Sequence, residues 1–397
     1  MEEVAAPRET ATAGDLLELV RRGRATTRAD LRRVTGMSRT ALVSRLGQLT
    51  DAGLLLPGIE LASTGGRPPA SLVFNASAGV VLAAAIGRSR SQVGVFDLAG
   101  TELGSSSVDH EIGAGPDEVM PIVASQLRAL LRGRPPVLGV GVSLPGTVDP
   151  VHGLSVDTAV MSGWDGVALA PYLSSVAAGP LLLANDADTL ARSELLGHAA
   201  AYDDLLVVKA STGLGLGILA GGRMITGSRG GAGEIGHTKV DAATGRPCRC
   251  GDSGCLETIA GGWALVGAIR AERSDVHHVR ELVALANRGD AEARQLLREG
   301  GRQLGDVLAV AVNLLNPQAV VLGGDMAGAF DVYAAGVRET LYARATALAT
   351  RELQVLPSTF GDRAGLVGCA AMALDRVLSP AAVDARLAAG VRGATGS

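Results

Sequence analysis

Residues 205–220 read LLVVKASTGLGLGILA, an apolar run followed by a glycine-rich stretch and a second apolar run. This pattern predicts a strand over Leu205–Ala210, a turn over Ser211–Gly217 and a returning strand over Ile218–Ala220. The same order recurs earlier in the chain, at Val80–Ile86, Gly87 and Gln92–Leu98. Because one unit occurs twice, the sequence predicts two similar lobes that face a cleft.

Three further apolar runs complete an α/β pattern. They predict buried strands over Val137–Leu144, Leu181–Ala184 and Ala319–Leu322. The second of these strands ends in Asn185 and Asp186. Open α/β sheets bind ligands at the carboxyl ends of their strands, so these two side chains are candidates for a binding site.

The composition places the chain in a broad class. Hydrophobic residues make up 47% of the 397 positions, which excludes global disorder. No apolar run reaches the roughly 18 residues of a transmembrane helix, and the acidic start Met1-Glu2-Glu3 is unlike a signal peptide. We therefore expect a cytoplasmic protein with no membrane partner, whose four cysteines serve metal or redox chemistry and form no disulfides.

Charge is distributed unevenly along the chain. The whole protein carries a net charge of −4, but residues 20–50 contain eight Arg and a single acid, Asp30. Within residues 13–52 the apolar spacing predicts three short helices, and the segments Leu54–Glu60 and Ser71–Phe74 predict a β-ribbon. Together these elements predict a winged helix-turn-helix domain that binds a double-stranded DNA operator.

The third predicted helix begins after Ser38 and has two faces. Leu42, Leu46 and Leu49 recur at helical spacing and point inward. The opposite face and the wing supply the predicted DNA contacts, which are Ser38, Arg39, Thr40, Ser44, Arg45 and Arg67. The alternative interpretation is a solvated polar face on a small helical bundle. Because one helix reads too few base pairs for specificity, we expect a dimer or tetramer on a roughly palindromic operator.

A cysteine-rich loop lies in the second half of the chain. Residues 248–255 read CRCGDSGC, and His237 precedes them. Three thiolates and an imidazole suit tetrahedral Zn²⁺, and four protein ligands leave no open position, as in structural sites. We expect one structural zinc ion per chain, bound by His237, Cys248, Cys250 and Cys255. The alternatives are free thiols or a redox pair, and Cys369, in an apolar run, is expected in the core.

Two carboxylates bracket this loop. Glu234 lies just before His237, and Glu257 follows Cys255. Carboxylates accept paired hydrogen bonds, so they suit the hydroxyl groups of a sugar. Each acid taken alone is as readily a helix cap or a surface group, and the argument for a sugar site depends on their combination with Asn185 and Asp186.

Taken together, these motifs resemble the ROK family of repressors, open reading frames and sugar kinases, from about residue 79 to 378. The resemblance rests on the segments 143–149 (SLPGTVD), 163–164 (GW), 185–187 (NDA), 211–217 (STGLGLG), 233–237 (GEIGH), 248–257 (CRCGDSGCLE) and 322–324 (LGG). It implies a two-lobed, actin-like (ribonuclease H-like) sugar-kinase fold, with a sugar in the cleft held by Asn185, Asp186, Glu234, His237 and Glu257. The winged helix-turn-helix at the N-terminus belongs to the family's repressors.

Two departures from the family's kinases point away from catalysis. The kinases use the aspartate at Asp186 as general base, and their first strand ends in Asp-x-Gly-Gly-Thr, which holds phosphate and Mg²⁺. Here Ala85 replaces the aspartate of that turn and Arg88 replaces its second glycine. Val160 stands where the kinases carry a sugar-binding asparagine. We therefore expect no catalytic residue in this chain and absent or vestigial phosphotransfer.

The sequence favours a sugar-responsive transcriptional regulator of carbohydrate metabolism, in the form of a repressor, whose effector is a sugar or a sugar phosphate. The alternatives are an active ATP-dependent sugar kinase and an inactive kinase-like regulator that does not bind DNA. The predicted domains are 1–75, the winged helix-turn-helix; 76–185, the first lobe, completed by 363–380; 186–362, the second lobe with the zinc loop and sugar site; and 381–397, a C-terminal tail.

Overall fold

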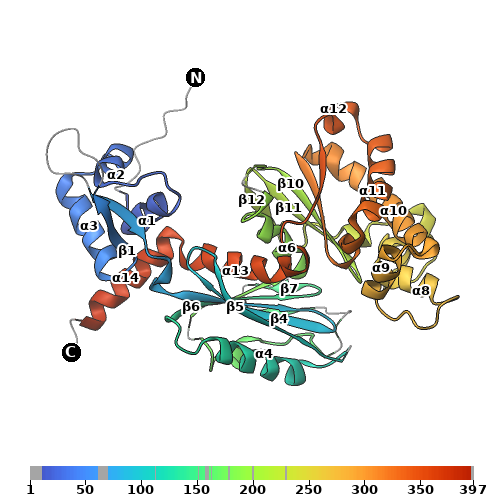
Figure 1. The fold of residues 1–397 in the computed structure, drawn as a ribbon, viewed down its shortest axis with the longest axis horizontal. Coiled ribbons are helices and arrows are strands. Elements are labelled where there is room, and N and C mark those ends of the chain that lie inside the picture. The colour runs from blue at the N-terminus through green and yellow to red at the C-terminus, as the bar shows by residue number, and fades with distance from the viewer. Residues whose placement is uncertain are drawn as a thin grey trace.

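The structure is a computed structural model of the chain. It describes residues 11–60, 70–111, 113–150, 152–156, 161, 163–177, 179–198, 201–228 and 230–394. An N-terminal helical body, a first lobe and a second lobe follow one another along the longest axis (Figure 1). The fold is therefore α/β, with a helical region in front of two lobes.

The N-terminal body has the order of elements that the sequence predicts. It consists of α1 (Ala13–Arg21), α2 (Arg28–Thr35), α3 (Arg39–Asp51) and the antiparallel strands β1 (Leu55–Glu60) and β2 (Ala70–Phe74). Thr27 and Asp30 form a capping box at the start of α2. Gly36, with a φ of 68°, ends this helix, and Ser38 starts α3 by accepting a hydrogen bond from the Ala41 N–H. The result is a helix, a three-residue turn and a second helix, followed by a β-ribbon.

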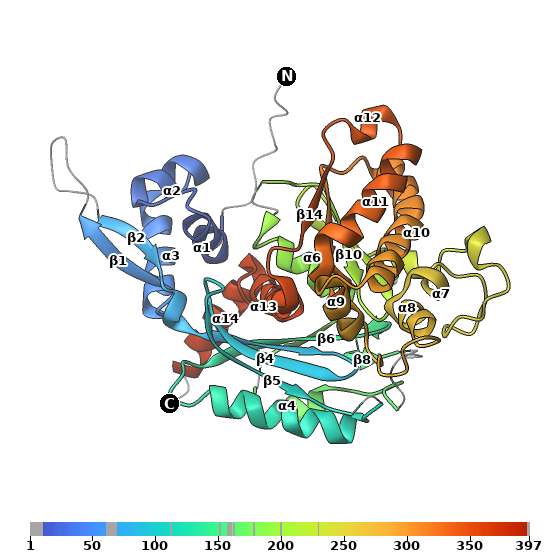
Figure 2. The ribbon, with the colours of Figure 1, turned by 45° about the vertical axis from the view of Figure 1, so that its right-hand side comes forward.

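A five-stranded sheet forms the centre of the first lobe. Its strands lie in the order β5 (Glu102–Asp109), β4 (Arg90–Asp97), β3 (Val80–Ile86), β6 (Val137–Leu144) and β9 (Leu181–Asn185). Strands β3, β4 and β5 pair antiparallel, whereas β6 and β9 join in parallel. Helix α4 (Pro116–Leu130) packs on one face of the sheet and α13 (Ala364–Val377) on the other (Figure 2).

The second lobe repeats this topology. Its sheet has the order β12 (Arg223–Ile225), β11 (Leu214–Ala220), β10 (Leu205–Ala210), β13 (Ala319–Gly323) and β14 (Gln354–Pro357). Again the first three strands along the chain are antiparallel and the last two join in parallel. The two sheets thus confirm the predicted pair of similar lobes.

The glycine-rich segment differs from its prediction in one respect. The turn is confined to residues 211–213, and β11 already begins at Leu214. Gly215 and Gly217 face α6 (Asp186–Glu194), and a Cβ added to either would lie 2.7 or 2.2 Å from an alanine of that helix. The two glycines are two residues apart because they lie on one face of a strand, on which α6 packs closely. The predicted turn was therefore too long.

The first and last helices that the structure describes meet at the N-terminal body. Residues 381–397, predicted as a tail, instead include most of helix α14 (Pro380–Ala394), which packs on α1. The Gly14 N–H donates to Asp384 Oδ1 at 2.8 Å, and Val383 is fully buried. A helix with an apolar side needs a partner, and α1 provides it. The apolar run around Cys369 forms α13, and Cys369 is fully buried as predicted.

The remaining elements surround the two sheets. They are the ribbon β7 (Val148–Asp149) with β8 (Leu154–Ser155), and the helices α5 (Ala170–Leu173), α7 (Glu257–Ala260), α8 (Gly262–Ile269), α9 (Val279–Asn287), α10 (Ala291–Leu315), α11 (Phe330–Arg344) and α12 (Ala347–Thr350). No single helix in the described ranges is long and apolar enough to span a membrane. One bent pair, 361–377 with 380–389, meets the length and composition criteria across a 60° bend.

Candidate functional site

A cleft of about 760 Å³ lies between the two lobes. The first lobe lines it with the turn between β3 and β4 and with Asn185 at the end of β9. The second lobe contributes the start of α6, the turn after β10, the loop around His237 and the glycine pair Gly323-Gly324 at the end of β13. Matching strand ends of the two sheets therefore converge on one space, which is the candidate ligand site.

An ion pair in the wall of the cleft joins α6 to the second sheet. Asp186 is the first residue of α6, and Lys209 lies on β10, on which α6 packs. Lys209 Nζ is 2.8 Å from Asp186 Oδ2, and the two side chains are only 24% and 21% exposed. Burial alone would lower the pKa of Lys209, but the carboxylates of Asp186, Asp325 and Glu257 together outweigh it and the pKa is raised. The carboxylate at the predicted general-base position is therefore held by a lysine.

Asn185 starts the helix that carries Asp186. Its Oδ1 accepts from the Ala187 N–H at 2.7 Å, and its Nδ2 donates to the Gly146 carbonyl at 2.7 Å. Both bonds fix the strand-to-helix turn. One amide proton and one lone pair remain for a ligand in the cleft.

Three carboxyl groups gather at this side of the cleft. Burial raises the pKa of Asp188 to about 6, against the opposing effect of Arg192, and the charges of Asp186 and Glu234 raise it further. Burial also raises the pKa of Glu234, although His237 opposes the shift. Both pKa values are raised because the carboxylates are partly removed from water and lie near other carboxylates.

Replacing Asp188 by Asn should stabilise the protein at pH 7.5 by on the order of 1–2 kcal/mol and leave its stability at pH 4 unchanged. The raised pKa means that the fold disfavours the charged carboxylate, so the wild type loses stability as the pH rises from about 4 past 6. Urea denaturation at both pH values measures this difference. Asp331→Asn, at an exposed position of α11, is the matched control and should change stability by less than about 0.5 kcal/mol. Equal effects of the two variants at pH 7.5 would contradict the prediction.

The four predicted metal ligands converge. One atom from each of His237, Cys248, Cys250 and Cys255 lies within 4.8 Å of the others. The Cys250 and Cys255 sulfurs are 3.8 Å apart, and Cys248 Sγ is 3.7 Å from His237 Nδ1. Tetrahedral Zn²⁺, with Zn–S bonds of about 2.3 Å, separates two sulfur ligands by about 3.8 Å. The donor set and its spacing therefore fit a four-coordinate zinc site.

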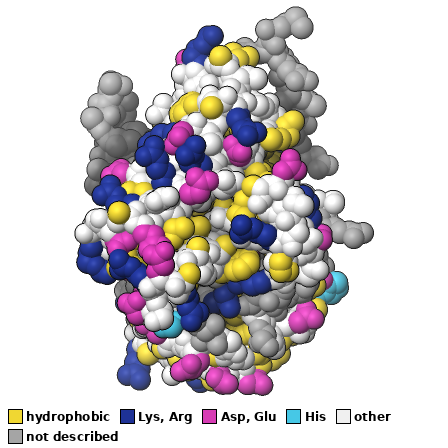
Figure 3. Space-filling view, turned by 90° about the vertical axis from the view of Figure 1, so that its right-hand side faces the viewer, with side chains coloured by type: hydrophobic (Ala, Val, Ile, Leu, Met, Phe, Trp, Pro, Cys, Tyr) yellow, Lys and Arg dark blue, Asp and Glu magenta, His cyan; other side chains and the backbone are white. Residues whose placement is uncertain are grey.

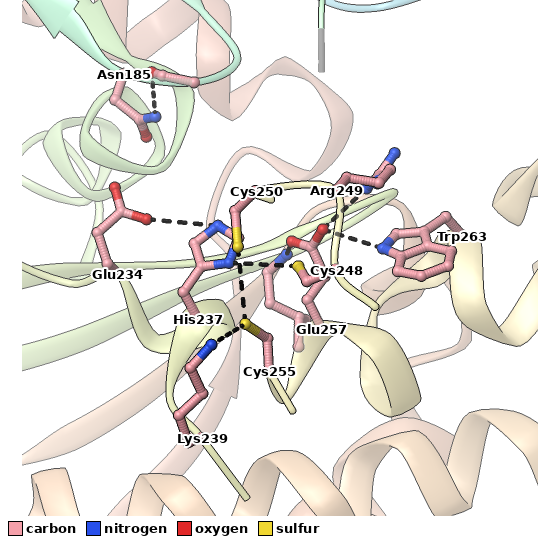
Figure 4. A network of polar contacts seen from close by, with 12 residues as sticks. Asn185, Glu234, His237, Lys239, Cys248, Arg249, Cys250, Cys255, Glu257 and Trp263 are labelled. Carbon is pink, nitrogen blue, oxygen red and sulfur yellow. Dashed lines mark hydrogen bonds and ion pairs between the residues drawn. The ribbon is translucent and has the colours of Figure 1, made fainter. Parts of the chain in front are cut away.

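Two charged groups flank this cluster (Figure 4). Lys239 Nζ lies 3.1 Å from Cys255 Sγ and 2.7 Å from Asp252 Oδ2. On the other side, His237 Nε2 is 3.9 Å from Glu234 Oε2, so the imidazole has one nitrogen toward the cysteines and one toward the cleft. With Zn²⁺ bound, the metal and three thiolates would sum to a charge of about −1, which the Lys239 ammonium would offset.

Glu257 lines the cleft and is held by three donors. Its Oε1 accepts from Arg249 at 2.9 Å and from Trp263 Nε1 at 3.0 Å, while its Oε2 accepts from the Leu214 N–H at 3.0 Å. The side chain is only 6% exposed. The carboxylate, for which the sequence predicts a role in sugar binding, joins the cysteine loop, α8 and the start of β11. Its observed contacts position the walls of the cleft (Figure 4).

Sequence reasoning missed the partners of these acids. Lys209 lies in a strand that otherwise reads as buried, and Arg249 stands between two metal ligands. The Arg249 guanidinium also lies 4.9 Å from the centre of the Trp263 ring. A lone lysine in an apolar strand was the available signal, because a buried ammonium requires an anion nearby.

Most of the predicted DNA-contacting residues lie at or near the start of α3, and one lies outside the described residues. Arg39, Thr40 and Ser44 are exposed on α3, Arg45 is half-buried on the same helix, and the Ser38 hydroxyl caps it. Arg67 lies outside the described residues. Val43, also on α3, is 50% exposed. The sequence did not predict this exposure, because an apolar residue in a helix is usually expected in the core.

The fold and the cleft define a two-lobed, actin-like protein of the sugar-kinase type that carries N-terminal helices. Residues 81–376 match the ROK family. The chain belongs to the ROK family.

Known proteins related to this chain include regulators and kinases. A xylose repressor of Bacillus subtilis is 25% identical over 368 residues, which are 91% of this chain and 94% of the repressor. A ROK family transcriptional regulator, described as a homologue of the Escherichia coli MLC protein, has the same fold with a TM-score of 0.78 at 24% identity, over 94% of this chain and 98% of its own. A ROK family glucokinase from Streptomyces griseus, in complex with glucose and AMPPNP, matches with a TM-score of 0.65 at 27% identity. That match covers 99% of the kinase but 74% of this chain.

Proposed function

We propose that this protein is a cytoplasmic DNA-binding repressor of carbohydrate metabolism whose affinity for its operator is set by a sugar bound in the cleft. One observation carries the proposal: the helix-turn-helix body and the first lobe share a single hydrophobic core. Leu16 of α1, Leu46 of α3, Val81 of β3 and Leu374 of α13 all belong to it and are buried. A DNA-binding body packed in this way moves with the lobe that lines the cleft.

Helix α3 is the proposed recognition helix. Arg39, Thr40, Ser44 and Arg45 supply donors for base edges and phosphates, and the exposed Val43 suits a thymine methyl group. The xylose repressor resembles this chain over the N-terminal region as well, whereas the glucokinase match leaves about a quarter of this chain uncovered. Both facts support DNA binding as the role of the N-terminal body.

We assign sugar binding to the cleft, but we do not assign phosphotransfer to it. Asn185, Glu234 and His237 line the cleft with groups that accept or donate hydrogen bonds to hydroxyls. Asp186 stands where a kinase needs a base, but its carboxylate is already engaged by Lys209 in an ion pair of 2.8 Å. Ala85 supplies no carboxylate for Mg²⁺. These contacts favour a binding site over an active sugar kinase.

The zinc ion is proposed as a structural component of the same site. His237, Cys248, Cys250 and Cys255 would hold it, and no ligand position is left for chemistry. With Nδ1 on the metal, the His237 ring would keep Nε2 directed at Glu234 and the cleft.

Helix α13 offers a route from the cleft to the DNA-binding body. Ala364 and Gly365 at its start line the cleft, and its later residues enter the shared core. The chain then continues into α14, which packs on α1. A sugar that contacts both lobes binds the closed arrangement better and shifts the population toward it. Movement of the first lobe would then carry the recognition helix with it.

The proposed operator-bound form is a dimer. Val310 and Leu314 of α10 and Leu348 of α12 are 59%, 78% and 75% exposed. A hydrogen bond from the Thr346 N–H to Asn313 Oδ1 brings α12 beside the end of α10. Figure 3 faces the second lobe, where hydrophobic side chains lie among interspersed acidic and basic ones. Such exposed apolar groups are typical of protein interfaces, and a two-fold axis would present two recognition helices to a palindrome.

Replacing Arg39 by Ala should lower operator affinity by about fivefold to a hundredfold, because a guanidinium on a recognition helix binds a base edge or a phosphate. DNA selected from genomic fragments by the wild-type protein serves as the probe, in titrations at several salt concentrations. Arg128→Ala, an equally exposed arginine on α4 of the first lobe, is the control and should keep wild-type affinity. Loss of binding in the control with full binding by Arg39→Ala would place the DNA surface elsewhere.

A further inference from the structure

Lys209 lies between two glycines on one face of the second sheet. In the register of β10 its partners are Gly215 on β11 and Gly323 on β13. Partners in register project their side chains from the same face of a sheet, and neither glycine has a side chain. Lys209 therefore has no side chain beside it on either neighbouring strand.

Helix α6 packs over both glycines. A Cβ added to Gly215 would lie 2.7 Å from the Ala187 Cβ. A Cβ added to Gly323 would lie 2.8 Å from Leu190 Cδ1. These close approaches set the first turn of α6 over the lysine, so the aspartate that begins the helix meets the ammonium.

The ion pair leaves free hydrogen-bonding groups on both residues. Lys209 Nζ carries three N–H donors, and Asp186 Oδ2 at 2.8 Å belongs to the single group within ion-pair distance among the residues that the structure describes. Within the same residues, no second donor bonds the Asp186 carboxylate. Both residues line the cleft, so two N–H donors and one carboxylate oxygen remain for a ligand.

Stability does not account for a lysine at this position. Its strand neighbours Val208 and Ala210 are fully buried. A buried ion pair is often no more stable than apolar residues of the same size, because both charges lose water. The pKa of Lys209 is raised, so the side chain keeps its positive charge at neutral pH. A charged group with free donors in the wall of the cleft is therefore suited to a ligand.

We propose that Lys209 is a specificity-determining residue of the cleft, which donates to one hydroxyl oxygen of the sugar while Asp186 accepts the proton of the same hydroxyl. This inference rests on the proposed function and adds a ligand contact to its site. A hydroxyl group is both a donor and an acceptor, so it satisfies the free groups of both residues at once. The ligand class that fits is a sugar whose hydroxyl at this point is free, because an ether or an ester there has no proton for Asp186.

The wild-type protein tests this pairing with analogues of its own ligand. A panel of neutral pentoses, hexoses and amino sugars is first screened by isothermal titration calorimetry, and the sugar that binds is then compared with its monodeoxy and monofluoro analogues. At one position the deoxy analogue should bind at least about thirtyfold more weakly than the parent sugar, because it leaves both charged groups without a partner. The fluoro analogue at that position should bind at least about threefold more tightly than the deoxy analogue, because fluorine accepts from the ammonium but has no proton for Asp186. This comparison does not depend on the folding of any variant.

Two variants assign the contact with fluorine to Lys209. Lys209→Met keeps the length of the side chain without its charge, so the fluoro and deoxy analogues should bind with equal affinity. Asp186→Asn leaves the ammonium in place, so it should keep the preference for fluorine while the parent sugar binds more weakly. Arg223→Met, at an exposed position of β12 in the same sheet, is the matched control and should preserve every wild-type affinity.

The outcomes separate this inference from the proposed function. Equal binding of the fluoro and deoxy analogues by the wild type at every position would overturn the contact with Lys209, because a lysine that only positions Asp186 predicts that result. Persistence of the difference in Lys209→Met would overturn the contact as well. In both cases a sugar still binds and the proposed function stands. Failure of every sugar in the panel to bind would contradict the proposed function and, with it, this inference.

Discussion

Cys255→Ala is expected to remove zinc from the protein and to loosen the loop between His237 and Glu257. Cys255 is fully buried, and its sulfur lies 3.8 Å from Cys250 Sγ. Structural zinc contributes apparent binding free energies of about 10 kcal/mol or more in small zinc-dependent folds, so its loss is expected to be among the largest effects of any single change here. The zinc content measured by elemental analysis should fall from about one ion per chain to nearly none. Limited proteolysis should cleave the variant within this loop.

A matched cysteine tests whether the effect belongs to the cluster. Cys369 is equally buried but lies in α13, and Cys369→Ala should retain the full zinc content. The sugar response should disappear only with Cys255→Ala, because the loop carries Arg249 and Glu257 into the wall of the cleft. Retention of one zinc ion per chain by Cys255→Ala, or a wild type that contains no zinc, would refute this ligand set.

Glu257→Ala is expected to destabilise the protein by about 3–5 kcal/mol, the usual cost when one partner of a buried ion pair is removed. The carboxylate satisfies three donors at once, on Arg249, Trp263 and Leu214. Without it the guanidinium lies over the Trp263 ring with no counter-charge. Chemical denaturation measures the loss, and the sugar response should be lost with it because the wall of the cleft is no longer held.

A double variant separates charge pairing from general damage. Arg249→Ala combined with Glu257→Ala removes both charges, so it should cost less than the sum of the two single changes. Glu257→Gln keeps the shape and one acceptor, so it should lie between wild type and Glu257→Ala. A Glu257→Ala protein within about 0.5 kcal/mol of wild type would show that this network does not support the cleft.

Much of the fold was predictable because its elements have strong local signals. Val80–Ile86 and Leu205–Ala210 are apolar runs that end at a glycine or a small polar residue, and both are strands with those bounds. One of the three helices expected within residues 13–52 is Arg28–Thr35, which begins after a capping threonine and ends at a glycine. The metal cluster was predictable for a similar reason, since its three cysteines lie within one short loop.

Other features depend on contacts between distant segments. Strand β5, Glu102–Asp109, contains three consecutive serines and is a strand because β4 pairs with it at the edge of the sheet. The ion pair of Asp186 with Lys209 forms only when α6 packs on the second sheet, and Glu257 is buried by contacts with three separate segments that contain Leu214, Arg249 and Trp263. No local pattern reveals which carboxylates are already occupied, so the sequence identified the acids of the cleft without their partners.

The most direct test of the whole account is the affinity of the full-length protein for its selected operator, measured with and without sugars and sugar phosphates. The account predicts sequence-specific binding at physiological salt and at least one sugar ligand that changes the dissociation constant by about tenfold or more, which corresponds to a coupling of about 1.4 kcal/mol between cleft and DNA. Specific DNA binding that no member of the panel alters, or binding that shows no sequence preference, would contradict it.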